Sequence, residues 1–238
     1  MGAASLKTVF LYSIGVASTQ LHPQVWRASE LAASVQSTTP TGWTALDAQL
    51  PGGGWPLGAV VELQAAVPPW RLLLPALQQA CRHGQVALVA LPLVPNAAAW
   101  AAHGLPLSRL WCVHPCDARE ALWCAEQLLT CPEVALCWLH VEEPPPLAWT
   151  QRLQQAAAAA RCAGARGDGA DWPAPLVVLS RPDDSARPDG ASAAPLRLRV
   201  RVEGPATLVV QVRKRRGPPL ARALRLHAPW LWSEWIEP

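Results

Sequence analysis

Short apolar runs alternate with segments of helical periodicity from residue 59 to residue 180. The apolar runs at residues 59–63, 85–91, 110–113, 134–140 and 176–180 predict buried strands. Residues 71–83, 96–103, 117–130 and 147–163 predict the helices between them. Buried strands separated by helices indicate a mostly parallel sheet with helices packed on its faces. The predicted fold class is therefore α/β.

Two of these helices carry start signals. Asn96 is placed to cap the helix at 96–103, because an Asn side chain accepts hydrogen bonds from the first free backbone N–H groups. Asp117 and Glu120 form a pair typical of a capping box ahead of the apolar periodicity at 122–129.

After residue 180 the helical pattern stops. Residues 196–202, 207–212 and 220–226 alternate apolar with polar or basic side chains, which predicts half-exposed antiparallel strands at one edge of the sheet. Residues 164–172 and 181–194 are the two long polar loops.

Four segments follow from the pattern. Residues 1–19 are expected to be a disordered segment or extension, and residues 20–40 a helix at 22–35 with a polar linker at 36–40. Residues 41–228 form the main domain, which begins with a short helix at 44–50 stopped by Pro51 and the glycines 52–54. Residues 229–238, called here the Trp-rich tail, end the sequence.

Composition supports a folded domain, since 51% of the 238 residues are hydrophobic. The net charge of +3 is unevenly distributed along the chain. Residues 1–195 hold 11 basic and 14 acidic residues, whereas residues 196–238 hold 9 basic and 3 acidic ones. The C-terminal stretch is therefore the candidate electropositive face.

The seven cysteines are expected to be buried free thiols in a reducing compartment. Cys112, Cys116, Cys124, Cys131 and Cys137 with His140 are dense enough to suggest zinc, but they fall inside strands and helices, which favours core thiols. No apolar run reaches the roughly 18–20 residues that a membrane span needs. We expect a cytoplasmic protein with no membrane partner.

The order of motifs resembles the core of the RecA recombinase. Residues 41–63 resemble the stretch that leads into the first core strand and phosphate loop of RecA. Residues 22–27, 51–56 and 71–77 resemble the ImuA family of RecA-like, SulA-like proteins, which are accessory factors of bacterial mutagenic translesion synthesis. The resemblance covers about residues 22–228. It implies a RecA-like, mostly parallel sheet flanked by helices, with antiparallel C-terminal edge strands and a short helical N-terminal lead-in.

The same resemblance implies partners and a role in the DNA-damage (SOS) response. The implied partners are the catalytically inactive Y-family-like protein ImuB, RecA itself, and indirectly an error-prone DnaE-type polymerase. The domain would act as an adaptor that supports the mutagenic polymerase or limits RecA filaments.

By the resemblance, the phosphate loop should follow the strand at 59–63, where residues 64–71 contain no Gly, Lys, Ser or Thr. Pro68 and Pro69 also remove two N–H donors that such a loop would direct at phosphate. The glycines 52–54 precede their strand and are better interpreted as a tight turn at the other end of the sheet.

Other parts of an ATPase are also missing. Pro92 and Leu93 stand where the resemblance places the catalytic Glu, and Leu139 and His140 where it places the magnesium-binding Asp. Glu142 and Glu143 are expected to be a solvated loop pair. Ser180 lacks a nucleophile-elbow motif, and the histidines mark no obvious triad. We expect no catalysis, cofactor or metal.

Two features are candidate partner-binding sites. Arg213, Lys214, Arg215 and Arg216 follow a predicted strand, and they could contact a protein partner, bind DNA phosphates weakly, or be a solvated strand edge. Trp230, Trp232 and Trp235 lie in the Trp-rich tail, where they could anchor a partner or pack on their own domain.

Three alternatives stay open. A SulA-type inhibitor of cell division also has a RecA-like domain without a phosphate loop. A nucleotidase with rebuilt ligands would bind ATP, and a DNA-binding module would use the basic C-terminal strands. RecA-type DNA binding is disfavoured, because the loops at 142–146 and 181–190 are acidic and would repel a phosphate backbone.

Overall fold

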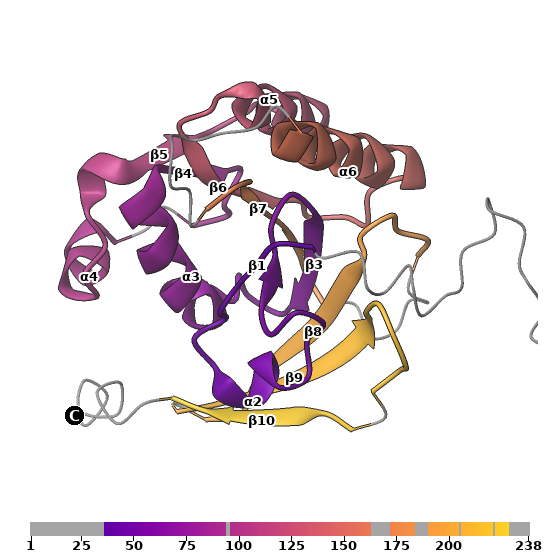
Figure 1. Ribbon diagram of the computed structural model, residues 1–238. Coiled ribbons are helices and arrows are strands. Elements are labelled where there is room, and N and C mark those ends of the chain that lie inside the picture. The colour runs from indigo at the N-terminus through magenta and orange to yellow at the C-terminus, as the bar shows by residue number, and fades with distance from the viewer. Residues whose placement is uncertain are drawn as a thin grey trace, which may run out of the picture. The chain divides into compact units, whose positions relative to one another are not determined.

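The computed structural model describes residues 36–93, 96–162, 172–183, 190–204, 206–220 and 222–228. They contain an eight-stranded sheet in the order β10-β9-β8-β3-β7-β6-β4-β5 (Figure 1). The strands are β3 (Val60–Ala65), β4 (Gln85–Val89), β5 (Leu110–Val113), β6 (Val134–His140), β7 (Leu176–Arg181), β8 (Leu196–Val202), β9 (Thr207–Lys214) and β10 (Leu224–His227). The predicted helix at 22–35 and the Trp-rich tail lie outside the described residues.

The sheet changes from parallel to antiparallel at β8. Strands β5, β4, β6, β7, β3 and β8 are mutually parallel, whereas β9 and β10 run antiparallel. A mostly parallel α/β sheet with antiparallel edge strands is the fold class predicted from the sequence, and it is confirmed. Strand β8, predicted as one of the antiparallel edge strands, is the junction between the two parts of the sheet, because it pairs in parallel with β3 and antiparallel with β9.

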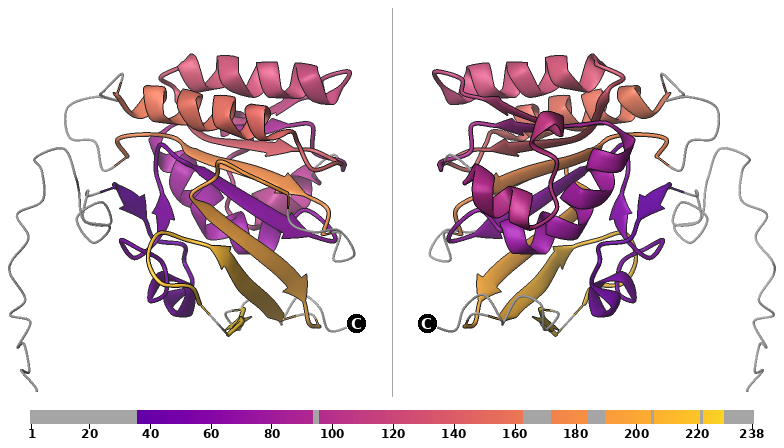
Figure 2. Two further views of the ribbon diagram at one scale, coloured as in Figure 1. Left: turned by 90° about the vertical axis from the view of Figure 1, so that its right-hand side faces the viewer. Right: turned by 90° about the vertical axis from the view of Figure 1, so that its left-hand side faces the viewer.

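Helices cover both faces of the sheet (Figure 2). Helix α3 (Trp70–His83) packs on one face, and α5 (Ala118–Thr130) and α6 (Leu147–Cys162) pack together on the other. A hydrophobic core lies on each face of the sheet, and alternate residues of β3 pack into one or the other. Val61 and Leu63 belong to the core on the α3 side, and Val60 belongs to the core on the α5–α6 side. This period of two follows from strand geometry, and it explains why the central strands are apolar on both sides.

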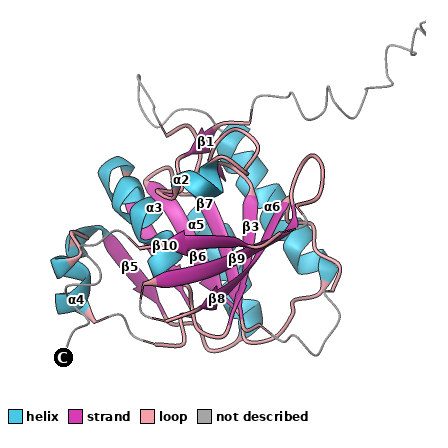
Figure 3. Ribbon diagram, turned by 90° about the horizontal axis from the view of Figure 1, so that it is seen from below, coloured by secondary structure: helices cyan, strands magenta, loops and turns pink. Residues whose placement is uncertain are grey.

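The remaining helices are short. Helix α2 (Thr44–Asp47) lies near β10 (Figure 3), α4 (Ala97–Ala102) follows β4, and a 3₁₀ turn, η1 (Leu107–Arg109), leads into β5. The predicted caps are confirmed: the Asn96 side chain accepts from the Ala99 N–H, and that of Asp117 from the Glu120 N–H. Glu120 in turn accepts from the Cys116 N–H at 2.6 Å, one residue before the N-cap, so the reciprocal bond goes to the preceding N–H and not to that of Asp117 as in a standard capping box. None of the helices within the described ranges is long and apolar enough to cross a membrane.

The predicted linker at 36–40 is a pairing segment instead. Thr38–Thr39 forms strand β1, which pairs antiparallel with β2 (Trp55–Pro56). The glycines between them form the predicted turn, in which Gly52 and Gly53 have φ values of 78° and 75°. Gly58 donates to the carbonyl of Pro175 just before β7, so this turn lies by the amino ends of the parallel strands.

Candidate functional site

The candidate site is the carboxyl edge of the parallel strands, where open α/β sheets bind ligands. After β3, residues 66–69 form a short loop, and α3 begins at Trp70. The Trp70 N–H donates to the Pro68 carbonyl at 2.8 Å, and the Leu72 N–H donates to that of Pro69 at 3.0 Å. Since Pro68 and Pro69 have no N–H, this loop offers few backbone donors to an anion.

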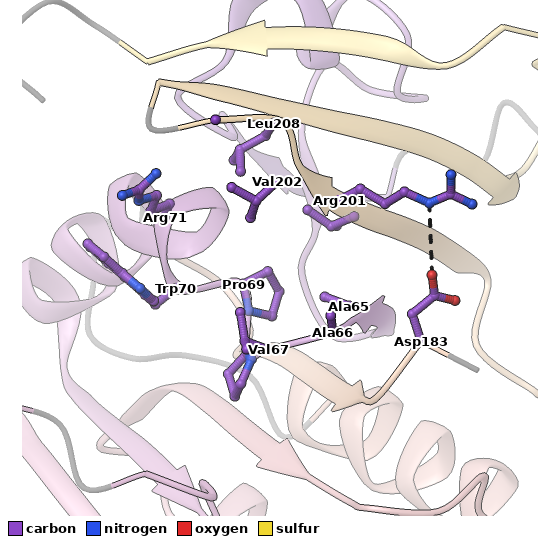
Figure 4. Close-up of a pocket in the computed structure, with 13 residues that line it drawn as sticks. Ala65, Ala66, Val67, Pro69, Trp70, Arg71, Asp183, Arg201, Val202 and Leu208 are labelled. Atoms are coloured by element: carbon purple, nitrogen blue, oxygen red, sulfur yellow. Dashed lines mark ion pairs between the residues drawn. The ribbon is translucent and has the colours of Figure 1, made fainter. Parts of the chain in front are cut away.

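A groove lies beside this loop (Figure 4). Its volume is about 640 Å³, which falls in the range of ordinary ligand pockets. The β3–α3 segment forms one wall, and the end of β8 and the start of β9 form the other. The lining residues are mostly apolar, with Arg71, Arg201 and Asp183 at the polar positions. The β3–α3 wall lies within residues 64–71, the slot after β3 where the resemblance places a phosphate loop. The wall from β8 and β9 could not be located from the sequence.

A buried ionic cluster underlies the groove on the α6 side of the sheet. Glu62 is 2% exposed, and its carboxylate lies 3.0 Å from Arg181 Nε and 3.1 Å from Arg197 Nε. Gln64 Nε2 also donates to Glu62 at 3.2 Å. Burial alone would raise the pKa of Glu62, but a hydrogen bond from Ser192 and the Arg197 charge lower it below its ordinary value. The carboxylate therefore stays ionised at neutral pH.

A second ion group extends the cluster to the groove. Asp183 lies 2.9 Å from Arg199 Nε and 4.0 Å from Arg201 Nε, and Figure 4 shows the second contact at the groove rim. Three of the basic residues counted in the C-terminal stretch, at 197, 199 and 201, are therefore paired with acids inside the domain. The expected acidic loop at 181–190 is also different, because Arg181 is buried in β7 and Asp183 is ion-paired. Residues 184–189 lie outside the described part of the chain.

Sequence reasoning missed this cluster, although a signal was present. Glu62 and Gln64 alternate with apolar residues in one strand, and Arg197, Arg199 and Arg201 do so in another. A carboxylate and an amide at period two in one strand, and arginines at period two in another, predict cross-strand pairs once the strands are neighbours. In the sheet Glu62 is directly opposite Arg197, and Gln64 is opposite Arg199.

The ends of β6 and β7 are joined by a buried chain of polar side chains. Trp138 Nε1 donates to Ser180 Oγ at 2.7 Å, and Ser180 Oγ lies 2.9 Å from His140 Nδ1. His140 Nε2 lies 3.4 Å from the exposed carboxylate of Glu142. Ser180 and His140 are 1% and 4% exposed, so Ser180 has no access to a substrate. The structure thus places Ser180 and Glu142 in contact with His140, which was not predicted from the sequence. Because Ser180 and His140 are buried, we interpret these contacts as structural.

Burial sets the protonation of His140. It lowers the pKa of His140 below its ordinary value, and the Glu142 carboxylate only partly opposes this. In the neutral state with the proton on Nε2, the Nδ1 atom can accept the Ser180 hydroxyl, which itself accepts from Trp138. All three side chains then have partners.

This arrangement predicts a pH dependence. A buried histidine with a lowered folded pKa contributes stability above pH 6.5, and that contribution is lost as pH falls through the folded pKa. The free energy of unfolding, measured by urea denaturation, should therefore fall between pH 7 and pH 5 more steeply in the wild type than in His140→Asn. Equal pH slopes in the two proteins would show that His140 is not the group responsible.

The described cysteines differ in burial, and Cys124 and Cys131 are half-buried. Cys81 and Cys137 are buried, as predicted, and burial raises the pKa of Cys81 to about 11 and that of Cys137 to about 12. Cys112 and Cys116 are exposed, so the expectation of core thiols was wrong for them. Within the described ranges, no three potential ligands gather in a way that could hold a metal ion.

The predicted basic site lies at the opposite edge from the groove. Arg213, Lys214 and Arg216 are exposed at the end of β9, and Lys214 is paired with Arg197 at the start of β8. Arg215 is half-buried and bonds the carbonyls of Gln49 and Pro218, which assigns it a structural role in holding this turn. Arg213, Lys214 and Arg216 are therefore the residues of this site that face outward.

The Trp-rich tail, with Trp230, Trp232 and Trp235, lies outside the described residues, which end at Ala228. Strand β10 runs parallel to β8, because both are antiparallel to β9. The described chain therefore ends at the carboxyl edge, beside the groove and away from the basic turn.

Comparison with protein-family models gives no match for this chain, and neither does comparison with curated proteins.

Proposed function

We propose that this domain is a RecA-like adaptor without catalytic activity, resembling the ImuA family, that works in the cytoplasm in bacterial SOS translesion synthesis. It binds ImuB, RecA or both, and so supports an error-prone DnaE-type polymerase or limits RecA filaments. No cofactor takes part. The observation that carries the proposal is the slot after β3, where a loop with two prolines and an apolar groove stand in place of a phosphate cradle.

The ends of the neighbouring strands support the same proposal. In a RecA-like ATPase the end of β6 would supply a magnesium-binding carboxylate, but here His140 is engaged with Ser180. Asp183, a carboxylate that lines the groove, is paired with Arg199. A partner would accordingly meet the same surface with and without ATP.

The exposed basic turn is the proposed contact surface. Arg213 and Arg216 are exposed to solvent at the carboxyl end of β9 and in the turn that follows it. Charges at the rim of an interface steer association and select partners. Deleting residues 213–238 would be a poor test, because β10 contributes the buried Leu226 to the core. Substitutions at the turn avoid this.

The test is calorimetric titration of the full chain against purified ImuB and RecA, each with and without Mg·ATP. We expect a Kd of about 1 μM or lower for at least one partner. ATP should leave it unchanged, and R213E/R216E should weaken it about tenfold or more. The matched control is R82E/R119E, which reverses two exposed charges elsewhere and should leave binding intact.

Two results would overturn the proposal: no binding to either protein, or binding that requires ATP. A third arm addresses DNA. Affinity for duplex DNA that falls steeply with salt and is lost in R213E/R216E, without protein binding, would favour the DNA-binding module instead.

A further inference from the structure

The groove at the carboxyl edge exposes apolar surface on both of its walls. Val67 on the β3–α3 loop is 57% exposed, and Val202 at the end of β8 is 55% exposed. Both line the groove, together with Ala66, Pro68 and the buried Leu208. Apolar side chains gathered around a hollow of this volume are typical of a surface that another group covers.

Positive charge borders this apolar surface. Arg71 lines the groove at the start of α3, with its guanidinium 5.7 Å from the centre of the Trp70 ring. Arg201 lines it from β8, is 61% exposed, and is 4.0 Å from Asp183. Figure 4 shows Arg71 and Arg201 on opposite sides of the apolar residues. The groove therefore suits an occupant that combines large apolar side chains with carboxylates.

The described chain ends beside this groove. His227, the last residue of β10, is paired with Thr207, and the Ala228 N–H donates to the Ala206 carbonyl at 2.7 Å. Gly204 and Leu208, which flank these two partners in sequence, both line the groove. Whatever follows Ala228 therefore starts at the groove rim.

The segment that follows has the composition that the groove suits. Residues 229–238 contain Trp230, Trp232 and Trp235, and they also contain Glu234 and Glu237. Extended chain spans about 3.3 Å per residue, so ten residues reach about 33 Å at most. A short tether also gives its end an effective local concentration of the order of millimolar.

We propose that the groove is a docking site for the Trp-rich tail of the same chain. Indole rings cover Val67 and Val202, and the tail carboxylates lie near Arg71 and Arg201. This inference does not depend on the adaptor function. It has a consequence for that function, because a docked tail withholds its tryptophans from any partner until the partner displaces them from the groove.

Photo-cross-linking in the full chain tests this docking. Trp232 is replaced by p-benzoyl-phenylalanine, the dilute protein is irradiated, and the cross-linked peptides are identified by mass spectrometry. We expect cross-links within one polypeptide to residues 65–71 or 200–208. Cross-links to other parts of the domain, cross-links only between two copies, or no cross-link would each overturn the proposal.

Groove variants make the test specific. Val202→Glu places a charge on the apolar wall and should reduce the cross-link yield about tenfold, because the carboxylate would be desolvated by the tail. Val67→Glu, on the opposite wall, should do the same. The matched control is Trp123→Glu on α5, whose side chain is 56% exposed outside the groove. An equal effect of the control and the groove variants would contradict docking at this site.

Discussion

Replacing Glu62 by leucine should lower the free energy of unfolding by about 3–5 kcal/mol, because it leaves two buried guanidinium groups without their carboxylate. Arg181 and Arg197 are 6% and 10% exposed, so water cannot replace the lost partner. Chemical denaturation followed by circular dichroism measures the change. We expect a lower midpoint at an unchanged slope.

A rescue variant separates the loss of charge pairing from a loss of packing. The triple variant E62L/R181M/R197M removes all three charges and should recover most of the stability, since well-packed apolar groups often replace a buried ion cluster without loss. Glu143→Leu, at an exposed site, is the control and should change stability by less than about 0.5 kcal/mol. If the triple variant were no more stable than Glu62→Leu, the cost would come from packing and not from the loss of the ion pairs with Glu62.

Acid should weaken the same cluster. The folded pKa of Glu62 lies below its ordinary value of 4.5, so its stabilising contribution is present above pH 4.5 and is lost as pH falls through the folded pKa. In Glu62→Leu this part of the acid dependence should be absent.

The second large effect is expected at Gly54. A Cβ atom at this position would lie 2.0 Å from the carbonyl oxygen of Thr39, which is backbone and cannot move aside without breaking the β1–β2 pair. Gly54→Ala should therefore cost about 1–3 kcal/mol, a usual range for overpacking. Thermal and chemical unfolding report the loss.

Substitutions at two other glycines are controls for this prediction. Gly190→Ala has open space around the added Cβ and no left-handed φ, so it should be nearly neutral. Gly53→Ala also has space but a φ of +75°, and it should cost about 1–2 kcal/mol through backbone strain alone. A neutral Gly54→Ala would contradict the close approach of β1 and β2.

The pattern of the sequence predicted the central elements well. Strands β6 and β8 begin and end where the periodicity placed them, and the capping pair of Asp117 and Glu120 located the start of α5. These features depend on local chemistry, namely period-two alternation and cap hydrogen bonds between close neighbours. Strand β10 begins at Leu224, later than the predicted 220, because its start is set by pairing with Val210 on β9 and not by local sequence.

The site was predictable only in part. The slot after β3 and its prolines could be located from the sequence, because the loop follows directly from a buried strand. The opposite wall at Val202 and Leu208 could not, since it depends on which distant strand lies beside β3. The same reason hid the strand at Thr38–Thr39, whose pairing partner lies beyond a turn. Long-range adjacency in the sheet, not local propensity, decided these features.

The cluster around Glu62 also constrains how this chain can diverge. Its three charges come from β3, β7 and β8, which are far apart in sequence but adjacent in the sheet. Because one substitution alone leaves a buried charge behind, positions 62, 181 and 197 should change together among relatives of this chain. An acidic residue at 62 should accompany basic residues at 181 and 197, and an apolar residue at 62 should accompany apolar ones. These three positions would then evolve as one unit, and chains with a mixed set should be rare.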